Sequence, residues 1–423
     1  MGLFSSHKKP PAPVPSMDVH LAASEDTMYH PDDNVSGHIA LSTPFPLTPQ
    51  AIEVSLWGQA KVWIRTNSSG SNNSTNYQHY RDDAPLFSVT FNMMPNPHEL
   101  VPDQIYNFPF NFRVPRGTGF DRSDCYKNAH EQPYMVTPHD LPPTFFFGHS
   151  EDSPDHASIA YGVTARLICP GVGVGKEQEA VSSTKPILFQ PLNPNALIPE
   201  VTVVRFPKNF TVQSSSLTGS EPSSIGFRKR IHDRFSSSTP KMDFELGIEV
   251  PDRLNASDEF SFRTSFAVLN KSDNVTYLPS VNFTISEIKL LDFTFFRAQR
   301  DWSASNTMSG WQHKNYRPGK EKLSLNWQQD IYREKKVLLN SIPASQLVEL
   351  KEVPVLGEKD KKILEQEEKC EVWFKARVPG FTPPSFQSFA ISRMYRVKIK
   401  LVVEIGEKKF PYEVESHVQH LGA

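Results

Sequence analysis

Apolar and polar side chains alternate at every second position through most of this chain. A period of two is typical of β-strands that bury one face and expose the other, whereas a helix repeats its apolar positions every three or four residues. Turn-forming Asn, Asp, Gly and Pro residues separate the alternating runs. The pattern therefore predicts many strands, in the ranges 35–41, 52–65, 87–93, 106–114, 159–167, 201–203, 244–250, 260–268, 281–296, 372–378 and 395–405.

The segment from Leu141 to Gly148 needs a second layer of structure. Pro142 and Pro143 open it, and three consecutive phenylalanines follow at 145–147. Since proline has no N–H group to give to a sheet, we expect this segment to pair at an edge or beyond the prolines. Three adjacent phenylalanines require burial on both sides of the backbone. A sheet packed against another layer meets both needs.

The strands fall into two groups, which predicts two domains. The chain has 423 residues, which is more than a single hydrophobic core usually supports. We expect an all-β protein of two tandem immunoglobulin-like β-sandwich domains, with a hinge at Asn193-Pro194-Asn195. The expected parts are a disordered tail at 1–16, a first sandwich at 17–192, and a second sandwich at 193–421. The second carries a Ser-rich insert at 214–240 and a hydrophilic insert at 301–369, whose charged end at 358–369 fits one helix or a solvated loop.

Composition narrows the class of protein further. The 36 prolines argue against long helices, and a net charge of −2 gives no global attraction for nucleic acid, so we expect no nucleic-acid partner. Cys125, Cys169 and Cys370 are widely spaced, which indicates neither a disulfide framework nor a zinc finger. Without an apolar stretch long enough for a signal peptide or a membrane span, we expect a soluble, cytoplasmic protein in a reducing compartment.

The N-terminus carries a candidate lipidation site. Gly2 together with Ser6 fits the N-myristoylation pattern, and Lys8 and Lys9 would add the electrostatic contact that one acyl chain needs for stable membrane attachment. The alternative is a disordered tail in which Gly2 occurs by chance.

A basic stripe lies in the last predicted strand. Arg396, Lys398 and Lys400 share one face and are candidates for contact with an anionic surface, either lipid or an acidic protein segment. On a half-exposed strand, however, polar residues must fill the outer face in any case, and a solvated sheet face is the simpler interpretation.

The Ser-rich insert contains candidate phosphorylation sites. The basic run at 228–230 precedes Ser236, Ser237, Ser238 and Thr239, and phosphate on these hydroxyls would pair with the basic side chains. A plain flexible loop is the alternative.

An enzyme is the rival class. His139, Asp140 and the acidic loop 149–156 hold enough histidines and carboxylates for a metal site, but their spacing matches no ligand motif. The sequence also lacks a Gly-x-Ser-x-Gly element, a phosphate loop and a dinucleotide fingerprint. We therefore expect no catalytic residues, no metal and no cofactor. A metal-dependent enzyme on a β-sandwich is an alternative that the sequence disfavours.

The order of several motifs resembles the arrestin family, its fungal α-arrestin branch in particular. Tyr29 with the run 35–41 is similar to the opening segment of that family, and 52–60 to its "I-x-V-x-L-x-G-x-A" strand. The most diagnostic part is Leu141-Pro142-Pro143-Thr144-Phe145 followed by Ile159-x-Tyr161-x-Val163-x-Ala165. Further landmarks lie at 108–112, 378–386 and 391–399.

The resemblance implies an adaptor rather than an enzyme. Arrestin-like proteins bind cytoplasmic tails of membrane proteins and link them to ubiquitination and endocytic trafficking, in the cytoplasm or peripherally at the plasma membrane or endosomes. Many α-arrestins recruit a ubiquitin ligase through Pro-Pro-x-Tyr motifs. This chain has Phe in place of Tyr at 142–145 and 383–386, and no lysine or arginine at 17–23 for phosphate-triggered activation. A structural scaffold, like the retromer subunit that shares the fold, is the alternative function.

Overall fold

The computed structural model shows two compact units, each built from segments that are distant in sequence. It describes residues 14–69, 75–125, 133–170, 177–193, 195, 202–218, 239–300, 333–338, 340–342, 345–348, 351–354, 366–380, 382–405 and 407–422. Unit 1 comprises Met1–Leu192, Phe295–Tyr332 and Gln387–Ser392, and unit 2 comprises Asn193–Thr294, Arg333–Phe386 and Arg393–Ala423.

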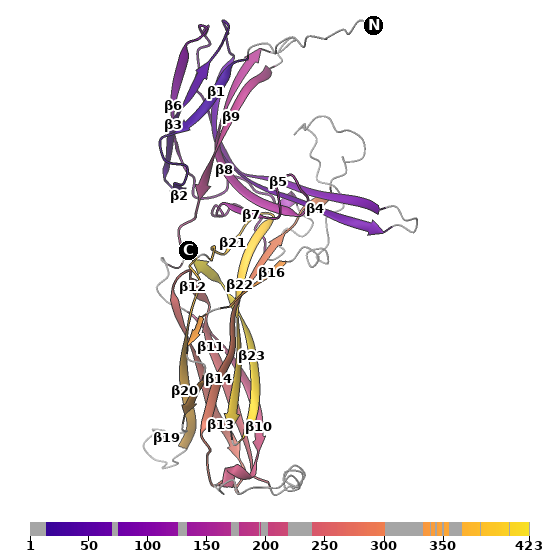
Figure 1. The fold of residues 1–423 in the computed structure, drawn as a ribbon, viewed down its shortest axis with the longest axis vertical. Helices are drawn as coiled ribbons and strands as arrows, with labels where there is room; N and C mark the ends of the chain where they lie inside the picture. Colours follow the sequence, from indigo (N-terminus) through magenta and orange to yellow (C-terminus); the bar gives the residue numbers. More distant parts are fainter. Residues whose placement is uncertain are drawn as a thin grey trace, which may run out of the picture. The chain divides into compact units, whose positions relative to one another are not determined.

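Unit 1 contains a three-stranded sheet in the order β1-β3-β6 and a seven-stranded sheet in the order β15-β5-β4-β8-β9-β2, in which β7 also pairs with β8 (Figure 1). One short 3-10 helix, η1 (Ser123–Cys125), lies in a connection. The strands are β1 (Ser16–Leu21), β2 (Met28–Tyr29), β3 (Asn34–Ser42), β4 (Ala51–Ser69), β5 (Thr75–Asn92), β6 (Ile105–Arg113), β7 (Phe145–Phe147), β8 (His156–Pro170), β9 (Glu177–Phe189) and β15 (Gln299–Arg300).

The core of unit 1 forms where alternate side chains of the two sheets point inward. Phe91 of β5 stacks on Phe112 of β6 with ring centroids 5.1 Å apart, which joins the two sheets directly. The fully buried residues follow the predicted period of two along β3, β4 and β8. They include Val35, Ile39, Leu41, Ile52, Val54, Leu56, Val163, Ala165 and Leu167.

A β-bulge in β5 interrupts the alternation. The register of β4 and β5 shifts between Gly58 and Gln59, so that Leu86 and Phe87 are both buried. An ideal Cβ at Gly58 would lie 2.6 Å from the Tyr161 ring and 2.9 Å from the Phe87 ring. Glycine at this position therefore makes the space that two consecutive inward side chains require.

Unit 2 contains one sheet in the order β10-β11-β13-β20-β17, with β19 on β20, and another in the order β16-β14-β22-β21, with β18 on β14 and β23 on β22. A parallel pair, β12-β24, and a 3-10 helix, η3 (Ser215–Thr218), complete it. The strands are β10 (Val203–Gln213), β11 (Lys241–Pro251), β12 (Arg253–Asn255), β13 (Glu259–Lys271), β14 (Val281–Phe296), β16 (Arg333–Leu338), β17 (Asn340–Ile342), β18 (Ser345–Val348), β19 (Lys351–Pro354), β20 (Gln366–Arg377), β21 (Phe386–Gln387), β22 (Ile391–Ile405), β23 (Lys408–Val418) and β24 (His420–Gly422).

Phenylalanine rings fill the core of unit 2. Phe262 stacks on Phe374 with centroids 5.4 Å apart, and Phe244 lies 4.9 Å from Phe266. All four rings are fully buried. The chain has 29 phenylalanines, and those in the core of unit 2 serve packing between strands.

The same tie between a tyrosine and a proline carbonyl occurs once in each unit. The Tyr161 hydroxyl donates a hydrogen bond of 2.6 Å to the Pro142 carbonyl, and the Tyr395 hydroxyl donates one of 2.8 Å to the Pro383 carbonyl. Burial raises the pKa of both phenols. The Pro-Pro segments at 142–143 and 383–384 thus have a structural role in holding the chain against a long strand.

The predicted all-β fold is confirmed, with two local corrections. The three phenylalanines of β7 are not all buried: Phe146 is 48% exposed, because β7 is a short edge strand that turns only alternate side chains inward. The hydrophilic insert also contains strands β16 to β19, and residues 366–369 of its charged end belong to β20. Their pairing with β13 and β19 outweighs the helical preference of Gln and Glu. Residues 358–365 lie outside the described residues.

The space at Gly58 generates a stability prediction. We expect Gly58→Ala to lower the free energy of unfolding by about 1–3 kcal/mol, because the new methyl group overlaps two buried rings. Gly119→Ala is the matched control, since nothing lies within 4 Å of a Cβ built there, and its effect should stay within about 0.5 kcal/mol. Urea denaturation followed by circular dichroism measures both. Equal stability of the two variants would contradict the packing role of Gly58.

Candidate functional site

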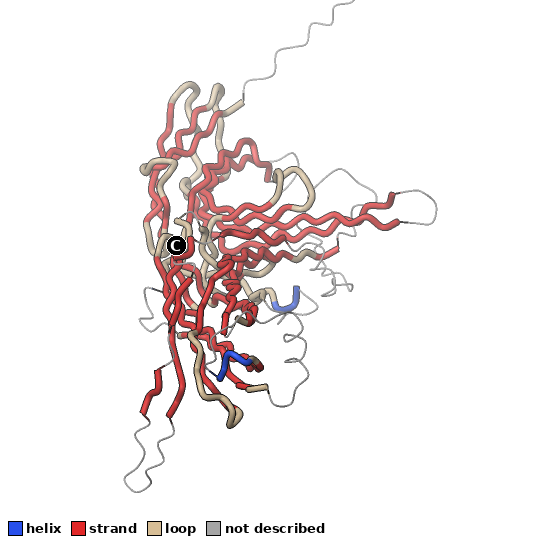
Figure 2. The backbone as a smooth tube through the Cα atoms, turned by 60° about the horizontal axis from the view of Figure 1, so that its bottom comes forward, coloured by secondary structure: helices blue, strands red, loops and turns tan. Residues whose placement is uncertain are grey.

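The hairpin of β4 and β5 extends beyond the other strands of unit 1 (Figures 1 and 2). Its last pairing with β8 joins Trp63 to His156, and farther along the hairpin β4 pairs with β5 alone. We call the outward-facing side of this hairpin the arm face. It comprises Lys61, Trp63, Arg65, Tyr77, His79 and Arg81, placed on one side by the period of two and by the register.

Aromatic and cationic side chains alternate across the arm face. The Arg81 guanidinium lies over the Trp63 ring at 4.6 Å from its centroid, and the Arg65 guanidinium lies over the Tyr77 ring at 4.8 Å. Between these two pairs, the Trp63 Nε1–H donates a hydrogen bond of 3.0 Å to His79 Nδ1. Each cation–π pair contributes about 0.5–1 kcal/mol at an exposed site. These contacts hold the side chains in one continuous layer.

The opposite side of the hairpin is anchored in the core of unit 1. Val62, Ile64 and Tyr80 are buried. Asp82, the neighbour of Arg81 in sequence, accepts a hydrogen bond of 2.6 Å from the Arg122 guanidinium, and the two side chains are only 1% and 8% exposed. A buried ion pair with this geometry requires both of its side chains, because removing one partner leaves the other charge buried without its counter-charge.

Two of the cations on the arm face have no acidic partner. Among the described residues, no carboxylate oxygen lies within 4.0 Å of the Lys61 or Arg65 charged groups. Asp83 is opposite Lys61 in the register and accepts a hydrogen bond from Gln59. Asp155 accepts a hydrogen bond of 3.1 Å from the backbone N–H of Arg65. Lys61, Arg65 and Arg81 outnumber Asp83 on this side of the hairpin, so the charge of the arm face is positive.

A second feature of β5 lies beyond the bulge. Val89 and Phe91 are paired with the buried Leu56 and Val54 of β4, so they face the interior of the sandwich, yet they are 37% and 49% exposed. Ile105, at the start of β6, is 67% exposed. Among the described residues, no strand pairs with β5 from Ser88 to Asn92 on the side away from β4, or with β6 on the side away from β3. We call this the open edge of unit 1.

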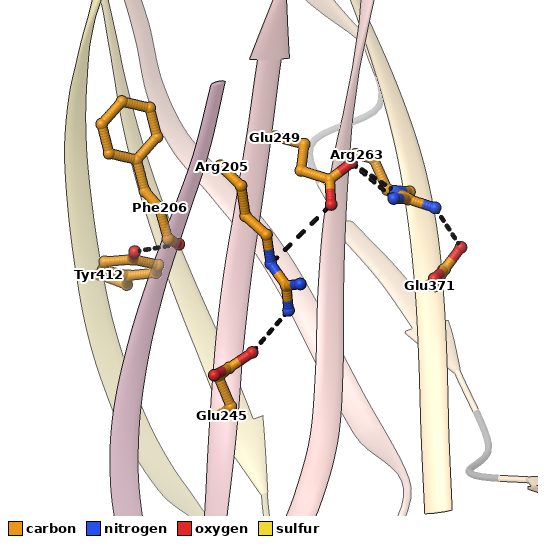
Figure 3. A network of polar contacts seen from close by, with 7 residues as sticks. All are labelled: Arg205, Phe206, Glu245, Glu249, Arg263, Glu371 and Tyr412. Carbon is orange, nitrogen blue, oxygen red and sulfur yellow. Dashed lines mark hydrogen bonds and ion pairs between the residues drawn. The ribbon is translucent and has the colours of Figure 1, made fainter. Parts of the chain in front are cut away.

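Unit 2 carries a network of charges that the sequence analysis missed. Arg205, Glu249, Arg263 and Trp373 form one row across four strands of the sheet. Figure 3 shows the contacts: Arg263 is 2.6 Å from Glu249 and 2.9 Å from Glu371, and Arg205 is 2.6 Å from Glu245. The charges compensate one another. In the sequence, the charged members of this row appear only as single residues in three separate alternating runs. The strand register is needed to show that they lie side by side.

Tyr412 closes the same region from the other sheet. Its hydroxyl donates a hydrogen bond of 2.6 Å to the Phe206 carbonyl of β10 (Figure 3). Burial raises the pKa of Tyr412 to about 12. Phe206 and Tyr412 thus link the two sheets of unit 2, and their role is structural.

The predicted basic stripe lies on β22, where each cation is paired with a glutamate. Arg396 lies 2.8 Å from Glu415, Lys398 lies 2.5 Å from Glu413, and Lys400 lies 3.0 Å from Glu287. The hydrogen bond from Lys398 lowers the pKa of Glu413. Contact with an anionic surface stays a prediction for these residues, but the pairing favours the simpler interpretation of a solvated sheet face.

The predicted modification sites lie mostly beyond the part of the chain that the structure describes. Gly2 and Ser236, Ser237 and Ser238 are outside the described residues. Thr239 is described and half-buried just before β11. These sites stay predictions.

The histidines considered for a metal site belong to no metal-binding cluster among the described residues. His139 Nδ1 lies 2.8 Å from the Thr137 carbonyl, and its other ring nitrogen lies 3.1 Å from the Ser388 hydroxyl. Burial lowers the pKa of His139. In the described ranges, no group of three or more His, Cys, Asp and Glu side chains is placed to hold a metal ion. No helix in those ranges is long and apolar enough to span a membrane.

Comparison with known protein families gives one match. Residues 17–119 match the model for arrestin (or S-antigen), N-terminal domain. They extend from β1 through β6 and include the arm face and the open edge. No curated protein matches the chain. The match confirms the family resemblance that the sequence motifs indicate.

The buried pair beneath the arm face generates a second stability prediction. We expect Asp82→Asn to lower the free energy of unfolding by about 3 kcal/mol, because it leaves the Arg122 charge buried without its partner. Asp32→Asn is the control. Asp32 makes exposed ion pairs with Arg113 and Arg116, so its loss should cost about 1 kcal/mol or less. Thermal and urea unfolding measure both variants, and an Asp82→Asn protein as stable as Asp32→Asn would refute the anchoring role.

Proposed function

Because this chain is an arrestin-like protein, we propose that it is an adaptor that binds cytoplasmic segments of membrane proteins and links them to ubiquitination and endocytic trafficking. It performs no chemistry of its own. Its place is the cytoplasm, with peripheral attachment at the plasma membrane or endosomes.

The observation that carries this proposal is the arrestin N-terminal domain at 17–119. Proteins of this family generally work by binding rather than by catalysis. The described residues of the domain fit that role, since they present exposed surfaces on a packed sandwich.

The open edge of unit 1 is the surface that supports binding of an extended protein segment. A strand edge without a partner offers backbone N–H and C=O groups to an added strand, and side chains beside it provide selectivity. Val89, Phe91 and Ile105 supply exposed apolar surface along this edge. A short segment of a partner protein with alternating apolar side chains suits this arrangement.

Recruitment of a ubiquitin ligase takes a route other than the usual motif. The chain contains no Pro-Pro-x-Tyr sequence. In the Pro-Pro segments at 142–143 and 383–384, a proline carbonyl accepts a hydrogen bond from Tyr161 or Tyr395, which supports a structural role for both segments. A modified insert at Ser236–Thr239 or a second adaptor would supply the link, and acylation at Gly2 would add a membrane anchor.

Proximity labelling in cells tests the adaptor function. A biotin ligase fused to the C-terminus of the full chain should label integral membrane proteins and ubiquitin-pathway components. Replacing Phe91 and Ile105 with Asp should reduce labelling of the membrane proteins about tenfold or more, because both residues are exposed and each charge opposes apolar contact.

Val203→Asp provides the matched control for this experiment. Val203 is also exposed, but it lies on β10 of unit 2. Its substitution should leave the labelling pattern unchanged. A wild-type pattern without membrane proteins or ubiquitin components would refute the adaptor function, and an equal loss in the Val203 variant would refute the role of the open edge.

A further inference from the structure

We propose that the arm face of the β4–β5 hairpin binds the surface of an anionic lipid bilayer. This contact is separate from the open edge and does not depend on the adaptor function. It follows from the charge, the aromatic content and the shape of the hairpin.

Charge is the first argument. Residues 61–81 contain Lys61, Arg65 and Arg81 and no Asp or Glu, although the whole chain has a net charge of −2. Within the described part of the structure, neither Lys61 nor Arg65 has a carboxylate within 4.0 Å. The basic stripe of β22 is different, because each of its cations has a glutamate partner. Uncompensated cations are the ones that gain from nearby lipid phosphates and carboxylates.

Aromatic side chains are the second argument. Trp63 and Tyr77 alternate with the cations, and Tyr77 is 48% exposed. Tryptophan and tyrosine concentrate at the boundary between lipid and water, since their rings are apolar and their N–H or O–H groups need polar partners. An acidic protein segment would use the cations but would not require aromatic rings among them. The composition therefore favours a bilayer over an acidic peptide.

Geometry is the third argument. The hairpin extends beyond the other strands of unit 1 (Figure 1), and its arm face is the side away from the core of that unit. The Arg65 guanidinium lies over the Tyr77 ring at 4.8 Å from its centroid, and a planar guanidinium holds its N–H donors in the geometry that suits phosphate oxygens. Asp83 lies opposite Lys61 in the register, and Asp155 accepts a hydrogen bond from the Arg65 backbone N–H, but neither carboxylate pairs with the charged group of these cations. The favourable contact is thus made by the side chains of Lys61 and Arg65 on the arm face.

Vesicle co-sedimentation tests the proposal. The full chain should carry Gly2→Ala in every sample, which removes any acyl chain. We expect it to bind vesicles of phosphatidylcholine with about 30% phosphatidylserine and to bind pure phosphatidylcholine vesicles far less. Lys61→Gln with Arg65→Gln should weaken binding to the anionic vesicles about 25-fold, at about fivefold for each cation near a charged bilayer.

A charge-matched variant controls for the loss of two positive charges. Arg205→Gln with Arg263→Gln removes the same charge from a face of unit 2 on which both cations are paired with glutamates. This variant should bind anionic vesicles as the parent does. Equal weakening in both double variants, or no preference of the parent for anionic vesicles, would overturn the proposal. Circular dichroism must show that both variants keep the strand content of the parent.

Tryptophan quenching separates a bilayer from an acidic protein partner. Vesicles that contain dibrominated lipid quench tryptophans that reach the lipid boundary. Trp63→Phe should remove most of that quenching, whereas Trp373→Phe, at a more exposed position in unit 2, should not change it. Full binding to polyglutamate without quenching by the brominated lipid would assign the arm face to an acidic protein segment and refute the bilayer contact. The proximity-labelling result does not bear on this outcome.

Discussion

Both surfaces of unit 1 depend on a single constraint, which is the strict alternation of side chains along β5. One additional residue at the bulge reverses the face on which every later side chain lies. Tyr77, His79 and Arg81 are odd-numbered and face outward, whereas Val89 and Phe91 are odd-numbered and face inward. One strand therefore supplies a charged aromatic layer at one end and an apolar edge at the other. The absence of a side chain at Gly58 makes this change of face sterically feasible.

The fold was largely predictable, because burial of one face imposes its period on the sequence. Runs such as 35–41, 159–167 and 395–405 lie inside β3, β8 and β22. Features that depend on register were not predictable. The stripe at Arg396, Lys398 and Lys400 looked uncompensated because its glutamates come from β23 and from β14, far away in sequence. The arm face escaped notice for the converse reason, because Lys61 and Arg65 have no carboxylate within 4.0 Å among the described residues.

Charge on the exposed faces of this protein follows two different arrangements. On the sheets of unit 2, arginines and lysines are matched to glutamates across neighbouring strands, as in the row from Arg205 to Arg263. Such pairs add little stability each, but they leave a surface with no net preference for an anionic partner. On the hairpin of unit 1, the cations are matched to aromatic rings instead. A cation–π contact orients a cation without neutralising it, and the charge stays available to a ligand.

The length of the hairpin has a mechanical consequence. A strand of 19 residues such as β4 spans about 60 Å, at roughly 3.3 Å per residue. Pairing with β8 stops at Trp63, and β15 pairs with β5 only at Tyr80 and Arg81. Farther along the hairpin, the described residues of β4 and β5 pair only with each other. The line through Trp63 and His156 therefore divides the hairpin into a part braced by the sandwich and a part braced mainly by its own cross-strand pairing.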